Sequence, residues 1–145
     1  VVTYCIRNDI GTLIVGYNTT FQRSSDLGRQ MNQVFVGIPF GILRRKLKYL
    51  CEMNGIRYVE QEESYTSMAS FWDLDEMPVY GEAGLVPPVF SGRRICRGLY
   101  QDRSGRRINA DVNGALNIMR KCNIVSLRAL YDRGDVDTPV RIRIA

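Results

Sequence analysis

Apolar and polar positions follow one another along the first half of the chain in an order that predicts an α/β protein. Residues 1–6 carry apolar side chains on one face of a short helix, and the apolar run 13–15 predicts a buried strand. Residues 39–51 show helical spacing after an initial proline, and residues 56–61 predict a second strand. A strand, a crossover helix and a second strand predict a right-handed unit with parallel strands.

The second half is predicted to contain an insertion and then a hairpin. Residues 64–91 are rich in proline and glycine and show little periodicity, which is typical of an inserted subdomain. Residues 93–100 can pair with residues 107–108 across the turn at 104–105. The hairpin therefore directly precedes the most regular helix pattern of the chain.

That helix is expected over residues 110–122, with Asn109 as its cap. Apolar side chains recur along it at i, i+3, i+4 and i+7. The tail from residue 123 shows a helical patch near 127–131 and a strand-like alternation at 140–144.

Composition narrows the chemistry available to this chain. Its 145 residues include 20 Lys and Arg, 15 Asp and Glu, and no His. Catalysis would therefore depend on carboxylates, Lys, Tyr, Cys or a bound metal. The four cysteines form no C-x-x-C pair, which is typical of reduced thiols in the cytoplasm. No run of about 18 apolar residues predicts a membrane span, and the net charge of +5 favours polyanionic partners.

One carboxylate and two amides cluster at the start of the predicted helix 110–122. Asp111 lies in its first turn, and Asn113 and Asn117 share a face at i, i+4. In one interpretation Asp111 complements the helix dipole and both asparagines are solvated. In the other, the cluster belongs to a functional site.

The run Asp111-Val-Asn-Gly-Ala-Leu-Asn-Ile118 resembles the last active-site motif of the TnpB-type (OrfB) transposon-associated proteins, relatives of the RNA-guided type V CRISPR effectors. Four further matches precede this run in the chain and occur in the same order as in the family, at Phe35–Phe40, Lys48–Tyr49, Gly55–Ile56 and Tyr65–Ser67. Together they cover residues 10 to 120. Their common order is more specific than any one motif.

The resemblance implies an α/β, partial RNase H-like (RuvC-type) domain with parallel strands, a crossover helix and a small inserted subdomain. It implies an RNA-guided DNA endonuclease of a transposon, with DNA and guide RNA as partners, in which three carboxylates hold two Mg²⁺ or Mn²⁺ ions. We expect four segments: RuvC-like elements at 1–69, an insertion at 70–92, the hairpin and final helix at 93–122, and a tail at 123–145.

The chain departs from this family at two of the three carboxylates. The first would lie upstream of Val1, so the chain alone is expected to be inactive as a nuclease. The second is usually a glutamate after the first strand of this chain, where Gly16 stands instead. Glu62 or Glu63, at the end of the neighbouring strand, is a candidate replacement, and we favour Glu62. The alternative is that these acids form a solvated charge run.

A third departure concerns the zinc ribbon that the family usually inserts. Its two knuckle regions retain only Cys96, so a structural zinc is not expected and Cys96 is predicted to be a core thiol. Six apolar side chains are expected to hold the insertion instead: Phe71, Trp72, Tyr80, Leu85, Val89 and Phe90.

Basic residues gather around the predicted site. We predict that seven residues bind nucleic acid: Arg93, Arg94, Arg97, Tyr100, Arg103, Arg106 and Arg107. The alternative is a solvated hairpin surface. A second group, Arg44, Arg45, Lys46 and Lys48, is interpreted as the solvent-facing side of the helix 40–51.

Two other hypotheses about the function stay open at this point. Gly16 favours a catalytically dead relative that binds nucleic acid without cutting it. A plain α/β interaction domain with fortuitous matches is the third hypothesis. The sequence sets neither the guide and target nor the oligomeric state.

Overall fold

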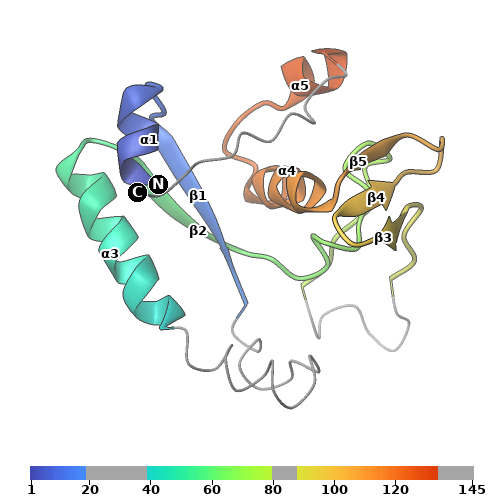
Figure 1. Cartoon of the computed structure of the whole chain (residues 1–145), viewed down its shortest axis with the longest axis horizontal. Coiled ribbons are helices and arrows are strands. Elements are labelled where there is room, and N and C mark those ends of the chain that lie inside the picture. Colours follow the sequence, from blue (N-terminus) through green and yellow to red (C-terminus); the bar gives the residue numbers. More distant parts are fainter. Residues whose placement is uncertain (19–38, 80–87, 134–145) are drawn as a thin grey trace. The chain divides into compact units, whose positions relative to one another are not determined.

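The computed structural model describes residues 1–18, 39–79 and 88–133. The chain divides into two compact units, 1–61 and 62–145 (Figure 1). This division falls at Gln61 and Glu62, whereas the segments expected from the sequence end at 69, 92 and 122. Both units contain strands and helices, so the α/β class is confirmed at this level.

The first unit is built from α1 (Val2–Arg7), β1 (Thr12–Tyr17), α3 (Phe40–Met53) and, up to Gln61, the strand β2 (Arg57–Glu62), whose last residue begins the second unit. β1 and β2 form a two-stranded parallel sheet, as the crossover pattern predicts. The core consists of four buried residues, Val2, Cys5, Cys51 and Ile56. Partly buried apolar side chains from the sheet and from α3 pack around them.

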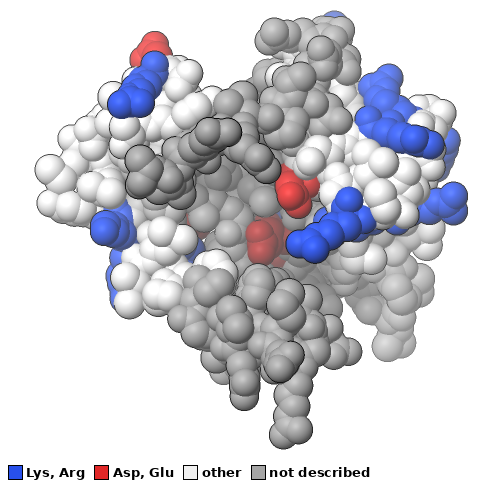
Figure 2. Space-filling model, viewed as in Figure 1, with Lys and Arg blue, Asp and Glu red and all other residues white. Residues whose placement is uncertain are grey.

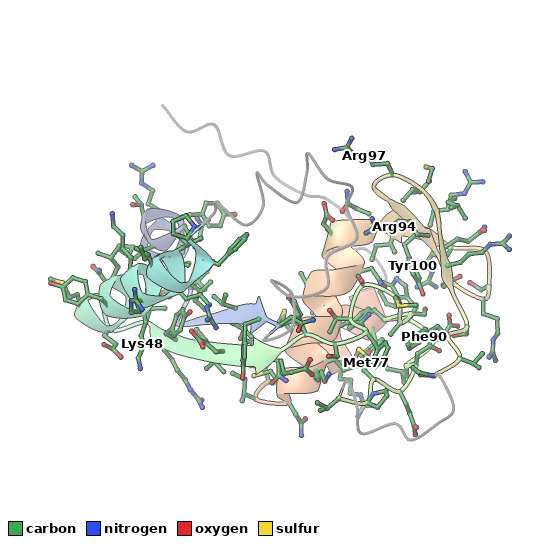
Figure 3. The ribbon with its side chains drawn as sticks, turned by 90° about the horizontal axis from the view of Figure 1, so that it is seen from below. Lys48, Met77, Phe90, Arg94, Arg97 and Tyr100 are labelled. Carbon is green, nitrogen blue, oxygen red and sulfur yellow. The ribbon has the colours of Figure 1, made fainter. Side chains whose placement is uncertain are left out.

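The helix α3 presents a basic face to solvent. Arg45, Lys46 and Lys48 are exposed, as predicted, and Lys48 is labelled in Figure 3. Arg44 differs, because its guanidinium forms an ion pair with Glu60 at 3.2 Å. Leu43, one of the apolar side chains that recur at helical spacing over residues 39–51, is exposed.

The second unit contains a three-stranded antiparallel sheet in the order β3–β4–β5. Its strands are β3 (Arg93–Cys96), β4 (Leu99–Gln101) and β5 (Arg107–Asn109). The expectation of one strand over 93–100 is wrong, because the chain reverses between β3 and β4. Gly98 has a φ of 78° there, a conformation that favours glycine and closes the turn.

The helix α4 (Ala110–Cys122) follows β5 without a break. Asn109 caps it as predicted: its Oδ1 accepts hydrogen bonds from the backbone N–H groups of Asp111 at 2.9 Å and Val112 at 3.2 Å. A short helix, α5 (Arg128–Arg133), matches the helical patch expected near 127–131. The strand-like alternation at 140–144 lies outside the described residues.

Two aromatic residues of the insertion enter the core of the second unit as predicted. Phe71 is fully buried, and Trp72 packs against the same cluster. The buried members are Phe71, Tyr100, Ile108, Ala110, Leu116 and Leu127. Phe90 is half-buried near the ring of Tyr65. Val89 is 92% exposed, so its predicted core role is wrong, and Tyr80 and Leu85 lie outside the described residues.

Within the described ranges, no helix combines the length and the apolar character needed to cross a membrane.

Candidate nucleic-acid interface

A polar stripe on α4 binds the segment that follows β2. Asn113, Asn117 and Lys121 are spaced at i, i+4 and i+8, so they share one face of the helix. The segment 62–71 runs along this face, from the last turn of α4 toward its first half. We call these three residues the α4 clamp.

The two asparagines of the α4 clamp bind backbone groups only. Asn113 donates from Nδ2 to the Ala69 carbonyl at 2.9 Å and accepts at Oδ1 from the Phe71 N–H at 3.1 Å. Asn117 donates to the carbonyls of Thr66 at 2.9 Å and Ala69 at 2.7 Å. These backbone carbonyls and this N–H are buried on folding and need hydrogen-bond partners. A side-chain amide can be both a donor and an acceptor.

Both asparagines are fully buried, so the interpretation in which they are solvated is wrong. The spacing in the sequence placed both side chains on the same face of the helix. It did not show whether that face is buried or exposed to solvent. Their contacts fit a structural role: Asn113 both donates to a carbonyl and accepts from an N–H, whereas Asn117 donates to two carbonyls and its buried Oδ1 has no partner in the described part of the chain.

Lys121 completes the α4 clamp with a charge. Its ammonium donates to Oε2 of Glu62 at 2.5 Å, to the Ser64 carbonyl at 3.2 Å and to the Pro78 carbonyl at 3.4 Å. Burial tends to raise the pKa of Glu62, but hydrogen bonds from Lys121 and Ser64 outweigh it and leave that pKa below its usual range. Glu62 is therefore a charged carboxylate with a cationic partner.

Glu63 is half-buried, and its pKa is raised by burial and by the neighbouring charge of Glu62. It lies in the chain between Glu62 and Ser64, which both contact Lys121. Both candidate glutamates thus belong to the part of the segment that is bound at the last turn of α4.

Asp111 lies at the other end of the same helix. It is exposed in the first turn of α4, ten residues before Lys121, which is about 15 Å along the helix axis. It also precedes Asn113 by two residues, so its side chain leaves the helix about 160° around the axis from the clamp asparagine. The structure thus does not bring Glu62 or Glu63 to Asp111.

These positions do not fit a two-metal cluster built on Asp111 and either glutamate. In such clusters the carboxylates bind ions about 3.5–4 Å apart. In the part of the chain that the structure describes, no three His, Cys, Asp or Glu side chains are grouped so as to hold a metal ion. The relocation of the second metal ligand to Glu62, which the sequence favours, lacks support from this geometry.

Carboxylates also organise the loop 70–75 and its contacts with the rest of the unit. Asp75 accepts hydrogen bonds from the backbone N–H groups of Ser70 at 2.8 Å and Ser91 at 3.0 Å. Asp73 accepts from the N–H of Arg103 at 3.0 Å. These bonds join the two ends of the insertion to the turn between β4 and β5.

Cys96 is exposed, so its predicted place in the core is wrong. It lies on β3, where all four residues are exposed.

The antiparallel sheet presents arginines on the face opposite its core. Arg93 pairs with Gln101, and Gln101 pairs with Arg107, so the three side chains form one row across the strands. The adjacent positions Tyr100 and Ile108 are buried, and side chains alternate along a strand. The row therefore faces away from the core, with its two arginines about 10 Å apart.

A second pair of arginines lies nearer to the start of α4. Arg94 is exposed on β3, and Arg97 is exposed in the turn that follows it. The carbonyl of Gly98 in that turn accepts a hydrogen bond from the Ala110 N–H at 3.0 Å, so the turn lies against the first residue of α4. Figure 3 shows Arg97 projecting at the edge of the unit.

The charges of these side chains give one part of the surface a basic character. Figure 2 shows Lys and Arg side chains over the part of the molecule that contains β3, β4 and β5. Arg97 and Asp111 flank the junction of the Gly98 turn with α4. Four of the six arginines predicted from the sequence, Arg93, Arg94, Arg97 and Arg107, are thus exposed on this sheet and its first turn.

Arg106 has structural contacts that the sequence did not indicate. Its guanidinium lies over the ring of Trp72, 4.6 Å from the centroid, and its Nε lies 4.0 Å from Oδ2 of the buried Asp102. The same Asp102 accepts from the backbone N–H of Arg106 at 2.8 Å. Arg106 thus holds the β4–β5 turn in shape, although half of its side chain is exposed.

Tyr100 does not present a ring to a ligand. It is 1% exposed, and its hydroxyl donates to the Met68 carbonyl at 2.8 Å. Burial, with the nearby charges of Asp75, Asp73 and Asp102, raises the pKa of Tyr100 to about 12. The prediction that Tyr100 binds nucleic acid is therefore wrong for this conformation, because its ring fills the core between the sheet and the 66–75 loop.

Two contributors to this architecture were missed by sequence reasoning. Lys121 continues the i, i+4 spacing of Asn113 and Asn117, so the extended stripe was visible as a pattern. Asp75 carried no such signal, because its partners Ser70 and Ser91 are distant from one another in the chain.

The described fold is an α/β protein in which an arginine-bearing sheet leads into a capped helix. A family model for the Cas12f1-like TNB domain matches residues 40–118, which is more than half of the chain. The chain belongs to this family, and the resemblance to TnpB/Cas12-type proteins is confirmed. A search of curated proteins finds no match.

Because it belongs to this family, the chain is related to TnpB and Cas12 proteins and acts on nucleic acid. The matched range begins at the first residue of α3 and ends within α4, so it includes the three-stranded sheet and most of the α4 clamp. The RuvC-type fold and the use of metal stay predictions.

Proposed function

We propose that this chain is part of an RNA-guided, metal-dependent DNA endonuclease of a transposon and that residues 93–109 supply a nucleic-acid-binding surface. The observation that carries this proposal is the arginine row on the outer face of the sheet, within the range matched by the family model. Arginine side chains neutralise phosphates and form paired hydrogen bonds with their oxygens.

The geometry of the row suits a backbone contact without base readout. Arg93 and Arg107 lie on the two outer strands, with the uncharged Gln101 between them. Gln101 is committed in part to the turn, because its Nε2 donates to the Gly105 carbonyl at 3.1 Å. The two arginines on this rigid sheet can contact two phosphates of the same nucleic-acid strand.

Binding measurements test this surface. We expect that Arg93→Ala and Arg107→Ala each weaken binding of a fluorescently labelled single-stranded DNA and lower the slope of log affinity against log salt by about 0.7. Arg45→Ala, which removes an exposed arginine from α3, is the matched control and should change neither quantity. Equal effects of all three substitutions would show that the sheet has no special role.

Arg106→Ala should behave differently from Arg107→Ala. It removes the contact with Trp72 and leaves the buried Asp102 with fewer partners, so thermal stability should fall. Arg107 has no contact of this kind among the interactions described above, and its substitution should leave the melting temperature within about 2 °C of the original. A loss of binding by Arg106→Ala without a loss of stability would assign it a direct contact instead.

Metal-dependent cleavage is proposed only for a protein in which the family's other carboxylates join Asp111. Mg²⁺ or Mn²⁺ would activate a water molecule and stabilise the leaving oxygen when bound. Asp111 is the candidate ligand here, since its carboxylate is exposed beside the basic turn. We expect no cleavage of labelled DNA by the purified chain with either ion. Cleavage that is abolished by Asp111→Ala would contradict this expectation.

A second candidate function is a relative that binds nucleic acid without cutting it. The observation in its favour is that Gly16 replaces the expected glutamate while Glu62 is bound to Lys121. A full-length protein that binds guide and target but never cleaves, even with Mn²⁺, would support this candidate over the endonuclease.

A further inference from the structure

Glu62 and Lys121 form the most enclosed ion pair among those that the structure describes. The carboxylate oxygen and the ammonium nitrogen are 2.5 Å apart, and the exposed fractions of the two side chains are 24% and 11%. The other two ion pairs each include an arginine that is at least 33% exposed. Charges that leave water to this extent need a well-placed partner.

The ammonium contacts three oxygens that come from two stretches of chain, 62–64 and Pro78. Glu62 ends β2, Ser64 lies in the turn after it, and Pro78 lies near the far end of the 66–79 stretch. An ammonium has three N–H groups, and each can serve one of these oxygens. Lys121 therefore ties two segments, residues 62–64 and Pro78, to the last turn of α4.

The Glu62–Lys121 ion pair lies at the start of the second unit. Glu62 is the first residue of the second unit, since the division between the units falls after Gln61. The pair therefore fixes the start of the second unit on α4. The neighbouring clamp bonds of Asn117 and Asn113 then continue along residues 66–71.

We propose that the Lys121 ammonium is the permanent ion-pair partner of the Glu62 carboxylate. Glu62 then has a structural role in the nucleic-acid-binding unit and is not a ligand for Mg²⁺ or Mn²⁺. Lys121 acts as a positioning residue: it holds the segment on which the sheet and its arginines are supported. This inference rests on the proposed function in one respect, because it concerns the nucleic-acid-binding unit, whereas the sequence had made Glu62 a candidate metal ligand.

A double-substitution cycle tests the pair in the whole chain. Urea unfolding is followed by the fluorescence of Trp72, the single tryptophan, which lies in the second unit. Lys121→Met and Glu62→Gln should each raise the equilibrium constant for unfolding by about tenfold to a hundredfold. The double variant should lose much less than the product of the two effects. Lys48→Met, on the exposed face of α3, is the control and should have almost no effect.

Limited proteolysis adds a readout that general destabilisation would not produce. A protease that cuts after glutamate should cleave Lys121→Met faster after Glu62 and Glu63, while cleavage after Glu52 in α3 stays at the original rate. Lys121→Arg keeps the charge and should restore much of the protection. Because cleavage is measured under native conditions, this test also serves if Lys121→Met proves too unstable for urea titration.

Divalent ions distinguish the two roles of Glu62. We expect Mg²⁺ and Mn²⁺ to leave the melting temperature of the original chain unchanged, because the carboxylate is occupied by the ammonium. Stabilisation by either ion that Glu62→Gln abolishes would overturn the proposal, and so would additive effects in the cycle. None of these measurements involves DNA, so a failure of the arginine surface to bind would be seen separately.

Discussion

Replacement of Asn113 by alanine tests how strongly the α4 clamp stabilises the second unit. The substitution removes one hydrogen bond to the Ala69 carbonyl and one from the Phe71 N–H. The Ala69 carbonyl keeps a partner, since Asn117 also donates to it at 2.7 Å. The N–H of Phe71 therefore loses the bond that Asn113 supplied, in the interior of the unit.

The expected loss follows from these contacts. A buried donor without a partner costs about 1–3 kcal/mol, and the space left by the amide adds roughly 1 kcal/mol. The free energy of unfolding should then fall by about 2–4 kcal/mol. For a urea dependence of about 2 kcal/mol per molar, the midpoint should shift by roughly 1–2 M.

Urea titration followed by Trp72 fluorescence measures this loss directly, because the Trp72 ring packs against Phe71 at 5.2 Å between centroids. Gln101→Ala is the matched control: it also removes an amide bonded to a backbone carbonyl, but an exposed one that water can replace. It should cost less than about 0.5 kcal/mol. If the two substitutions cost the same, the α4 clamp is not a major source of stability.

Three further outcomes are expected. Gly92→Ala should destabilise the second unit by roughly 1–3 kcal/mol in the same titration, because a Cβ at this position would lie 2.5 Å from the Tyr100 hydroxyl oxygen and 2.7 Å from the Gln101 carbonyl oxygen; an unchanged midpoint would contradict this. The pKa of about 12 for Tyr100 exceeds the unfolded value of about 10, so its contribution is complete below pH 10 and is lost as the pH rises through 12. Tyr100→Phe should weaken this alkaline loss in a pH series of unfolding midpoints, and an identical pH profile would count against it. Elemental analysis of protein purified without chelators should find no stoichiometric zinc, because the two knuckle regions keep one cysteine; one zinc per chain would show that other ligands bind it.

Local sequence patterns determined much of the secondary structure and its order. The apolar run at 13–15, the helical spacing after Pro39 and the run at 56–61 predicted β1, α3 and β2, because side-chain periodicity follows directly from backbone geometry. Asn109 was identified as the cap of α4 for a similar reason: a capping side chain bonds only to the residues that follow it.

Turns and strand limits in the hairpin region depended on weaker signals. The sequence did not reveal that the chain reverses at Arg97 and Gly98, since either an extended strand or a turn satisfies this short polar stretch locally. Pairing of β3 with β4 decided between them. The buried position of Tyr100 followed from that pairing, because it directed the ring toward the core.

The partners of the polar side chains were decided by the tertiary structure alone. The sequence placed Asn113 and Asn117 on one face of α4, but only the docking of residues 66–71 turned that face inward and gave both amides backbone partners. Glu62 was identified as a carboxylate at a strand end, which is a local property. Its binding to Lys121 joins residues 59 positions apart, and a contact of that range depends on how the whole unit packs.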